Sequence, residues 1–506
     1  MKQTSIVRGA LLLTGGSLFL RLCSMVFQVY LSREVGAAGL GLLQLISSVG
    51  VLAMALGCSG VRVVAMYLPA EEYGLRRSYG IRRAVNCCLV YGLCVSTAAA
   101  ILLYACSDWL ALHWLGDLRA APSLKIMAAF LPFTCLCAVM SGYFTACAKI
   151  RQLVGIEIAE RLVSLLATIV LLRTWARGSI VRACCAIIGG SSIGSVFDFA
   201  MMYAIYLKEQ RQYPAVEQPL HMPSRLLKLC VPLALNDYLR SGLSTAEQFL
   251  IPYGLSHAGQ SYEAAMSAYG TIHGMVFPLL MFPAVILYSV SDLLVPELSR
   301  CRAANNRLRI HALTKRCIQM GTVFAALVAG VCYTCAMPLG QVVYHSETAG
   351  HYLMLFAPMV LMLYLDAIVD GTLKGLAQQL YTVRYNTITS LLDVLLLVLL
   401  LPKLGIAGYY FSFALTHLLN FCLSIGRLCK VTDYKIPLSY WLRVGGCVTA
   451  AVLVCRLLPA PEGSLWLLLG QSGCFFAVSL GLLLLTDTLH MEDLRWLRWG
   501  LTATEK

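Results

Sequence analysis

Residues 9 to 31 form an apolar run that is long enough to cross a lipid bilayer, yet Arg21 stands near its middle. At 1.5 Å per residue a helix of this length spans about 34 Å, more than the roughly 30 Å hydrocarbon core. An arginine at that depth costs about 2.5 to 3.5 kcal/mol on insertion scales, so we expect it to face a bundle interior or a wet cavity. The run therefore predicts a membrane-embedded cationic site for an anionic, membrane-borne substrate.

The composition of the whole chain predicts an all-α polytopic membrane protein. Of its 506 residues 59% are hydrophobic and only 13% are charged, too few to solvate a soluble surface of this size. The net charge of +14 comes mostly from loops on one side of the predicted membrane. By the positive-inside rule that side is cytoplasmic, together with both termini, and no nucleic-acid surface is needed to explain the charge. We expect a multi-pass protein of a bacterial cell (plasma) membrane.

Windows of about 20 residues predict fourteen membrane helices. Many of the 21 cysteines lie inside these spans, where a thiol packs as a small hydrophobe, and no residue cluster has metal-ligand spacing. We therefore expect no metal and no cofactor. The predicted spans are 9–31, 43–68, 84–106, 124–147, 153–172, 182–207, 226–251, 266–295, 312–336, 352–376, 385–401, 405–428, 440–458 and 464–486.

An internal repeat predicts how these helices are grouped. A shift of 229 residues lays the segment from Gly142 over the segment from Gly371, and a shift of 219 lays Arg21 over Arg240. Six helices per unit would give parallel halves with a binding site between them. We expect two six-helix lobes around a central cavity and two additional C-terminal helices. The predicted domains are an N-lobe (1–208), a cytoplasmic linker (209–225), a C-lobe (226–430), and helices 13 and 14 with a cytoplasmic tail (431–506).

Ionisable residues within the spans are the candidate functional residues. The candidate anion-binding residues are the arginines at mid-depth in the first and seventh helices and one arginine in the second, which is also close enough to the inner end to snorkel. Acidic residues in the same spans would neutralise these arginines or bind a coupling cation, and both roles stay open. The candidates are Arg21, Arg240 and Arg62 for the substrate, and Asp237, Glu247, Asp366, Asp370 and Glu160 as acidic or coupling residues.

The opening residues resemble a known family. The stretch SLFLRLCSMVFQVYLSREVGAAGLGLLQLI, residues 17–46, is similar to the start of the oligosaccharide flippases related to stage V sporulation protein B, and SGYFTA at 141–146 gives a second match. Their superfamily includes the lipid II flippase and multidrug and toxic-compound extrusion transporters. The resemblance implies a two-lobed bundle that moves polyprenyl-diphosphate-linked sugars from the inner to the outer leaflet. It also implies that Arg21 holds the diphosphate.

These features favour a flippase for a lipid-linked oligosaccharide or cell-wall precursor, lipid II-like, with spore cortex as one setting. Guanidinium groups suit a diphosphate because they donate two hydrogen bonds in a fixed geometry. The alternatives are a cation-coupled multidrug exporter and a non-transporting scaffold for cell-wall synthases. A polyprenyl-phosphate sugar transferase would need a catalytic loop outside the membrane, so we expect no enzyme. The expected partners are the lipid-linked sugar, membrane lipids and cell-wall synthases, while the sugar, the oligomeric state and coupling by Na⁺ or H⁺ stay open.

Overall fold

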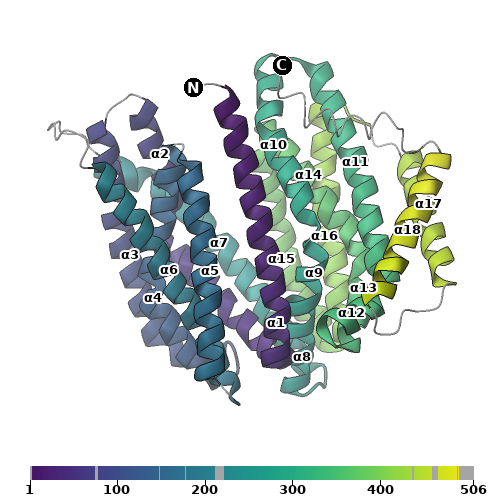
Figure 1. Ribbon diagram of the computed structural model, residues 1–506, viewed down its shortest axis with the longest axis horizontal. Helices are drawn as coiled ribbons and strands as arrows, with labels where there is room; N and C mark the ends of the chain where they lie inside the picture. Colours follow the sequence, from purple (N-terminus) through teal and green to yellow (C-terminus); the bar gives the residue numbers. More distant parts are fainter. Residues whose placement is uncertain are drawn as a thin grey trace. The chain divides into compact units, whose positions relative to one another are not determined.

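The computed structural model describes residues 3–74, 78–147, 149–176, 178–210, 222–435, 438–457, 465–486 and 488. These ranges form helices joined by short connections and contain no β-strand (Figure 1). The predicted all-α class is therefore confirmed. Most of the predicted linker, residues 211–221, and nearly all of the predicted tail, 489–506, lie outside the described residues.

The contacts divide the chain into two compact units. Unit 1 comprises Met1–Phe27, Val35–Tyr253 and Tyr262–Ser267, and unit 2 comprises Gln28–Glu34, Gly254–Ser261 and Ala268–Lys506. Most of the helix that follows the predicted linker thus belongs to unit 1 by its contacts. The lobe boundaries and the repeat stay predictions.

Unit 1 is built from long helices, of which α3 packs on α4, α5 on α6 and α4 on α6. Its interior is apolar: Met140 and Tyr143 of α4 pack with Val85 of α3, Ile156 of α5 and Met202 of α6. The elements are α1 (Gln3–Cys58), α2 (Val61–Gly74), α3 (Ser78–His113), a 3₁₀ turn (Leu118–Ala120), α4 (Ala121–Ala146), α5 (Ile150–Thr174), α6 (Ile180–Gln210) and α7 (Met222–His257).

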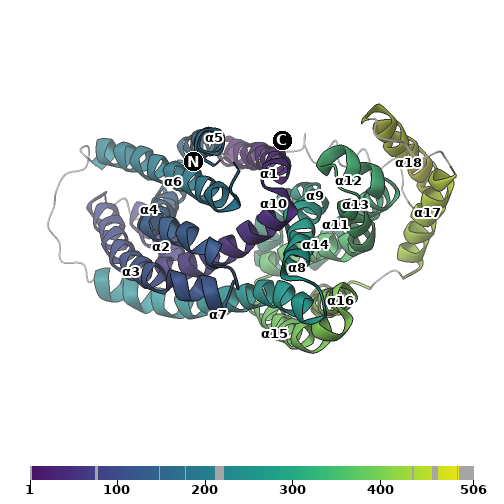
Figure 2. The same ribbon diagram turned by 90° about the horizontal axis from the view of Figure 1, so that it is seen from below.

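Unit 2 contains the shorter helices of the second half of the chain. The last two helices, α17 and α18, pack on α11 through Val323, Val448 and Phe475. Figure 2 shows α17 and α18 next to each other. The elements are α8 (Tyr262–Thr271), whose first six residues belong to unit 1, a π-helix (Ile272–Val276), α9 (Phe277–Met281), α10 (Ala284–Ala303), α11 (Arg307–Thr334), α12 (Ala336–Tyr344), α13 (Glu347–Phe356), a 3₁₀ turn (Ala357–Met359), α14 (Val360–Gly375), α15 (Gln379–Leu404), α16 (Ile406–Thr432), α17 (Leu438–Arg456) and α18 (Leu465–Leu485).

Eleven helical stretches among the described residues are long and apolar enough to cross a membrane. The first, Leu18–Cys58, includes parts of two predicted spans because α1 continues through a kink at Gly36. The predicted spans in α5 and α7 are helical, but each helix carries five charged residues and neither is among the eleven. The chain is a multi-pass membrane protein, and the total of fourteen stays a prediction.

Two predicted spans are interrupted. The span 43–68 breaks at Ser59 and Gly60, which both have positive φ angles of 43° and 75°. The span 266–295 contains the π-helix and is interrupted again at Phe282 and Pro283, between α9 and α10. Hydropathy windows average over such positions, whereas a left-handed residue or a π-turn interrupts the regular hydrogen-bond ladder locally. The first of these breaks positions a candidate arginine.

Candidate functional site

The break between α1 and α2 is held tightly against α7 within unit 1. A Cβ on Gly60 would lie 2.7 Å from the carbonyl oxygen of Cys230 and 3.1 Å from the backbone nitrogen of Ala234. The hydroxyl of Ser59 contacts the hydroxyl of Tyr238, and Val61 packs in one apolar cluster with Cys230. Only glycine fits at a left-handed position with backbone this close. The start of α2 is therefore fixed beside α7.

This placement brings together three of the candidate residues. Arg62 is the second residue of α2, and its guanidinium interacts electrostatically with Asp237 of α7. Asp237 also interacts with Arg240, one turn further along α7. Asp237 is partly buried, while both arginine side chains are exposed. Both guanidinium groups can donate paired hydrogen bonds, which suits an anion with several oxygens.

Arg21 lies in α1 of unit 1, and its side chain is exposed. Five residues earlier, Gly16 packs on α5, where a Cβ would lie 2.6 Å from Cγ1 of Val154. At 3.6 residues per turn Arg21 is about 140° around the helix from Gly16, on a face turned away from that contact. Glu247 is a partly buried residue of α7, also in unit 1.

A second group of ionisable residues lies between α5 and α6. Glu160 interacts with Arg161, Asp198 and Glu157, and a Cβ on Gly194 of α6 would lie 2.6 Å from its Oε1. Glu157 also interacts with Arg62, so this group and the α2–α7 group are electrostatically connected. Three carboxylates thus interact with one another and with the guanidinium groups of Arg161 and Arg62, which is typical of an ion network as well as of a binding site.

In unit 2 the candidate Asp366 and a further aspartate, Asp393, accept hydrogen bonds from neutral groups. Asp366 of α14 accepts a 3.1 Å hydrogen bond from the side-chain amide of Asn420, and its own helix places Asp370 close enough to repel it. Asp393 of α15 accepts bonds from the hydroxyls of Ser412 (2.7 Å) and Thr416 (3.2 Å) on α16. A buried carboxylate without a cation is costly, so this set suits an added proton or cation.

Sequence reasoning did not select three of these residues as site candidates. Glu157, Asp198 and Asp393 were visible as charges within apolar spans, but their partners lie on other helices and no spacing along one helix reveals them. Ser59-Gly60 carried a usable signal, since a Ser-Gly pair favours a turn. Within the described ranges no three His, Cys, Asp or Glu side chains form a group that could hold a metal ion.

Comparisons with known proteins agree with this architecture. The sequence profile of the family described as "Polysaccharide biosynthesis protein" matches residues 6–302. Stage V sporulation protein B of Bacillus subtilis (strain 168) is 20% identical over 467 residues, covering 90% of this chain and 89% of that protein. Sporulation protein YkvU of the same organism is 22% identical over 361 residues, covering 70% and 79%.

Two solved structures show the same fold. The lipid II flippase MurJ in an inward closed conformation superposes with a TM-score of 0.72 at 14% identity, covering 92% of this chain and 96% of that chain. An inward-facing multidrug resistance MATE family transporter of the MOP superfamily gives 0.61 at 14% identity, covering 82% and 96%. The chain therefore belongs to the polysaccharide biosynthesis protein family and has the fold of the MurJ and MATE proteins.

Proposed function

We propose that this protein is a flippase that moves a polyprenyl-diphosphate-linked oligosaccharide or cell-wall precursor from the inner to the outer leaflet. The observation that carries the proposal is the pair of exposed arginines, Arg62 and Arg240, which both interact electrostatically with the carboxylate of Asp237 in unit 1. Family membership and the homologous sporulation protein support a lipid-linked saccharide as the substrate class.

The proposed cycle needs no catalytic residue. Arg62 and Arg240 would exchange their interaction with Asp237 for charge-assisted hydrogen bonds to the diphosphate, and Arg21 would add a third donor. With both termini in the cytoplasm, an inside-negative membrane potential favours outward movement of the anion by about 2.3 kcal/mol per charge per 100 mV. The plasma membrane is the location that fits this direction of transport.

Coupling to a cation is a second part of the proposal. Asp366 and Asp393 are held by amide and hydroxyl groups, so protonation or Na⁺ binding at either would relieve an uncompensated charge. A multidrug exporter remains the alternative with the same fold. The two arginines disfavour it, because they repel the organic cations that such an exporter carries.

The test is transport by the purified protein in proteoliposomes. We expect it to accelerate the transfer of a fluorescent polyprenyl-diphosphate oligosaccharide across the bilayer, and not the export of a cationic dye. An absence of lipid transfer under a membrane potential, a proton gradient and a sodium gradient would refute the flippase. Dye export under the same gradients would favour the multidrug exporter.

A further inference from the structure

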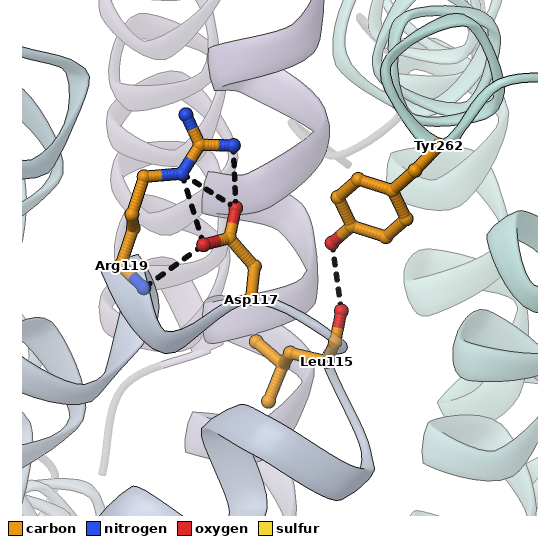
Figure 3. Close-up of polar contacts among 4 residues, drawn as sticks. All are labelled: Leu115, Asp117, Arg119 and Tyr262. Atoms are coloured by element: carbon orange, nitrogen blue, oxygen red, sulfur yellow. Dashed lines mark hydrogen bonds and ion pairs between the residues drawn. The ribbon is translucent and has the colours of Figure 1, made fainter.

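A rigid loop follows α3 in unit 1, on the side that the proposed orientation makes extracytoplasmic. Its backbone is tied to α3, with the nitrogen of Asp117 donating to the carbonyl of Ala111 over 2.9 Å. The Asp117 carboxylate accepts bonds from the backbone and the guanidinium of Arg119, both at 2.9 Å. The hydroxyl of Tyr262 donates to the carbonyl of Leu115 over 2.7 Å (Figure 3). These bonds fix the loop from two sides.

The fixed loop and the end of α3 carry a continuous group of aromatic rings. The rings of Trp109 and His113 stack with centroids 5.3 Å apart, and Trp114 lies 6.1 Å from Trp109. Phe249 of α7 supports Trp114 edge-on at 5.5 Å. Although they contact each other, Trp109 and Trp114 remain 52% and 44% exposed. Two indole surfaces are thus held in place and left open.

Charged residues lie before and after these rings in the sequence. Lys125 of α4 forms a 2.9 Å ion pair with Asp108, the residue before Trp109, and both side chains are accessible. The side chain of Arg119 is 48% exposed although Asp117 holds it. The residues on either side of the rings in the sequence therefore offer donors and acceptors of both charges, and no single sign dominates among them.

A tryptophan at the membrane interface has an ordinary explanation, since indole rings favour the headgroup region. Trp175, after α5 on the same predicted side, fits it: the ring is 49% exposed and stacks on no other ring among the described residues. The group around Trp109 differs, because its rings contact one another and Trp114 lies in a loop that is held by hydrogen bonds. Headgroup anchoring requires none of these features.

We propose that Trp109, His113 and Trp114 form a saccharide-binding surface. The C–H face of a pyranose ring stacks on an exposed indole, while its hydroxyls bond to groups such as Asp108, Lys125 and Arg119. The absence of a dominant charge fits a largely uncharged sugar. The inference rests on the proposed function, in which the surface receives the saccharide of the flipped lipid on the outer side.

The test uses soluble sugars without a lipid, so that binding is measured apart from transport. The full-length protein in nanodiscs is titrated calorimetrically with chitotetraose, a β-linked acetamido sugar, and with maltotetraose, an α-linked neutral one. We expect binding of at least one, weakened about tenfold or more by Trp109→Ala with Trp114→Ala, because two stacking rings are lost. Trp175→Ala is the matched control and should bind as the parent does.

A second variant distinguishes the loss of stacking rings from misfolding. Trp109→Phe with Trp114→Phe keeps two rings and should recover part of the affinity that the alanine variant loses. If neither sugar binds the parent, or if the alanine variant binds as well as the parent, the inference is wrong even where lipid transfer proceeds. If sugar binding is lost as expected but no lipid is transferred, the inference stands and the flippase proposal fails.

Discussion

The ionisable residues of unit 1 on α2 and α7 differ from those of unit 2 on α14 and α15 in the charge of their partners. In unit 1 the carboxylate of Asp237 interacts electrostatically with Arg62 and Arg240. In unit 2 Asp366 and Asp393 are held by Asn420, Ser412 and Thr416, which are neutral. Exposed arginines attract an anion, whereas acids with neutral partners attract a proton or a metal cation. The difference suggests a division of work, with substrate in unit 1 and coupling ion in unit 2.

The largest expected effect comes from a substitution at Gly60, the left-handed residue that lets α2 begin beside α7 in unit 1. Gly60→Ala places a Cβ in a left-handed position and against the backbone of α7. Conformational strain and overpacking together should lower the stability of the fold by about 2 to 5 kcal/mol. Thermal unfolding of the purified protein, followed by tryptophan fluorescence, measures the change.

Gly426→Ala in α16 of unit 2 is the matched control. No atom lies within 4 Å of the position that its Cβ would take, so this change should leave the unfolding temperature the same or slightly higher. Equal unfolding temperatures for the two variants would show that the break at Gly60 is not tightly constrained.

The next largest effect is expected on lipid transfer, through binding of the diphosphate anion. Arg240→Ala removes a charge-assisted donor from the proposed diphosphate site and should slow lipid transfer by about 10- to 100-fold, as expected for a lost bond of about 1.5 to 3 kcal/mol. Arg225→Ala, at an exposed ion pair with Glu71 near the start of the same helix, should have little effect. Transfer in proteoliposomes under a fixed membrane potential compares them. If Arg240→Ala keeps the parent rate, Arg240 is structural.

The effect expected in unit 2 is on coupling and not on binding. Asp393→Asn keeps a hydrogen-bonding group opposite Ser412 and Thr416 but removes the charge. Stimulation of transfer by a proton or sodium gradient should disappear, while transfer driven by membrane potential should persist. Asp292→Asn, an exposed aspartate of α10, should retain the stimulation. A variant of Asp393 that still responds to both gradients would remove this residue from the coupling site.

The smallest expected effect is on stability, and it concerns an ion pair in unit 1 that has a neutral counterpart in unit 2. In unit 1 Lys149, which precedes α5, pairs with Glu209 of α6, and Tyr143 donates to the same carboxylate over 3.0 Å. In unit 2 Arg427 of α16 donates instead to the neutral Gln378 over 2.6 Å. Glu209→Gln should cost about 1 kcal/mol of stability, because the pair is only partly buried. Urea unfolding at low and high salt should show the loss, and an unchanged midpoint would leave the pair without a stabilising role.

The sequence was sufficient for the class of the fold and for the residues that carry charge inside it. Apolar runs of about 20 residues locate the helices because the bilayer thickness sets their length. The pairing of Arg62 with Asp237 could not be predicted, since it depends on how α2 packs against α7. The π-helix around His273, whose Nε2 lies 3.0 Å from the Tyr409 hydroxyl, likewise has no pattern in the sequence. Spacing along one helix predicts neighbours on that helix only.

One comparison of variants tests the division of work most directly. Transfer of the fluorescent lipid is measured for the parent, for Arg62→Ala with Arg240→Ala, and for Asp366→Asn with Asp393→Asn, each under membrane potential alone and with an added cation gradient. The account predicts that the arginine variant transfers slowly under both conditions, and that the aspartate variant matches the parent under potential alone but gains nothing from the gradient. An arginine variant that transfers at the parent rate, or an aspartate variant that fails under potential alone, would contradict it.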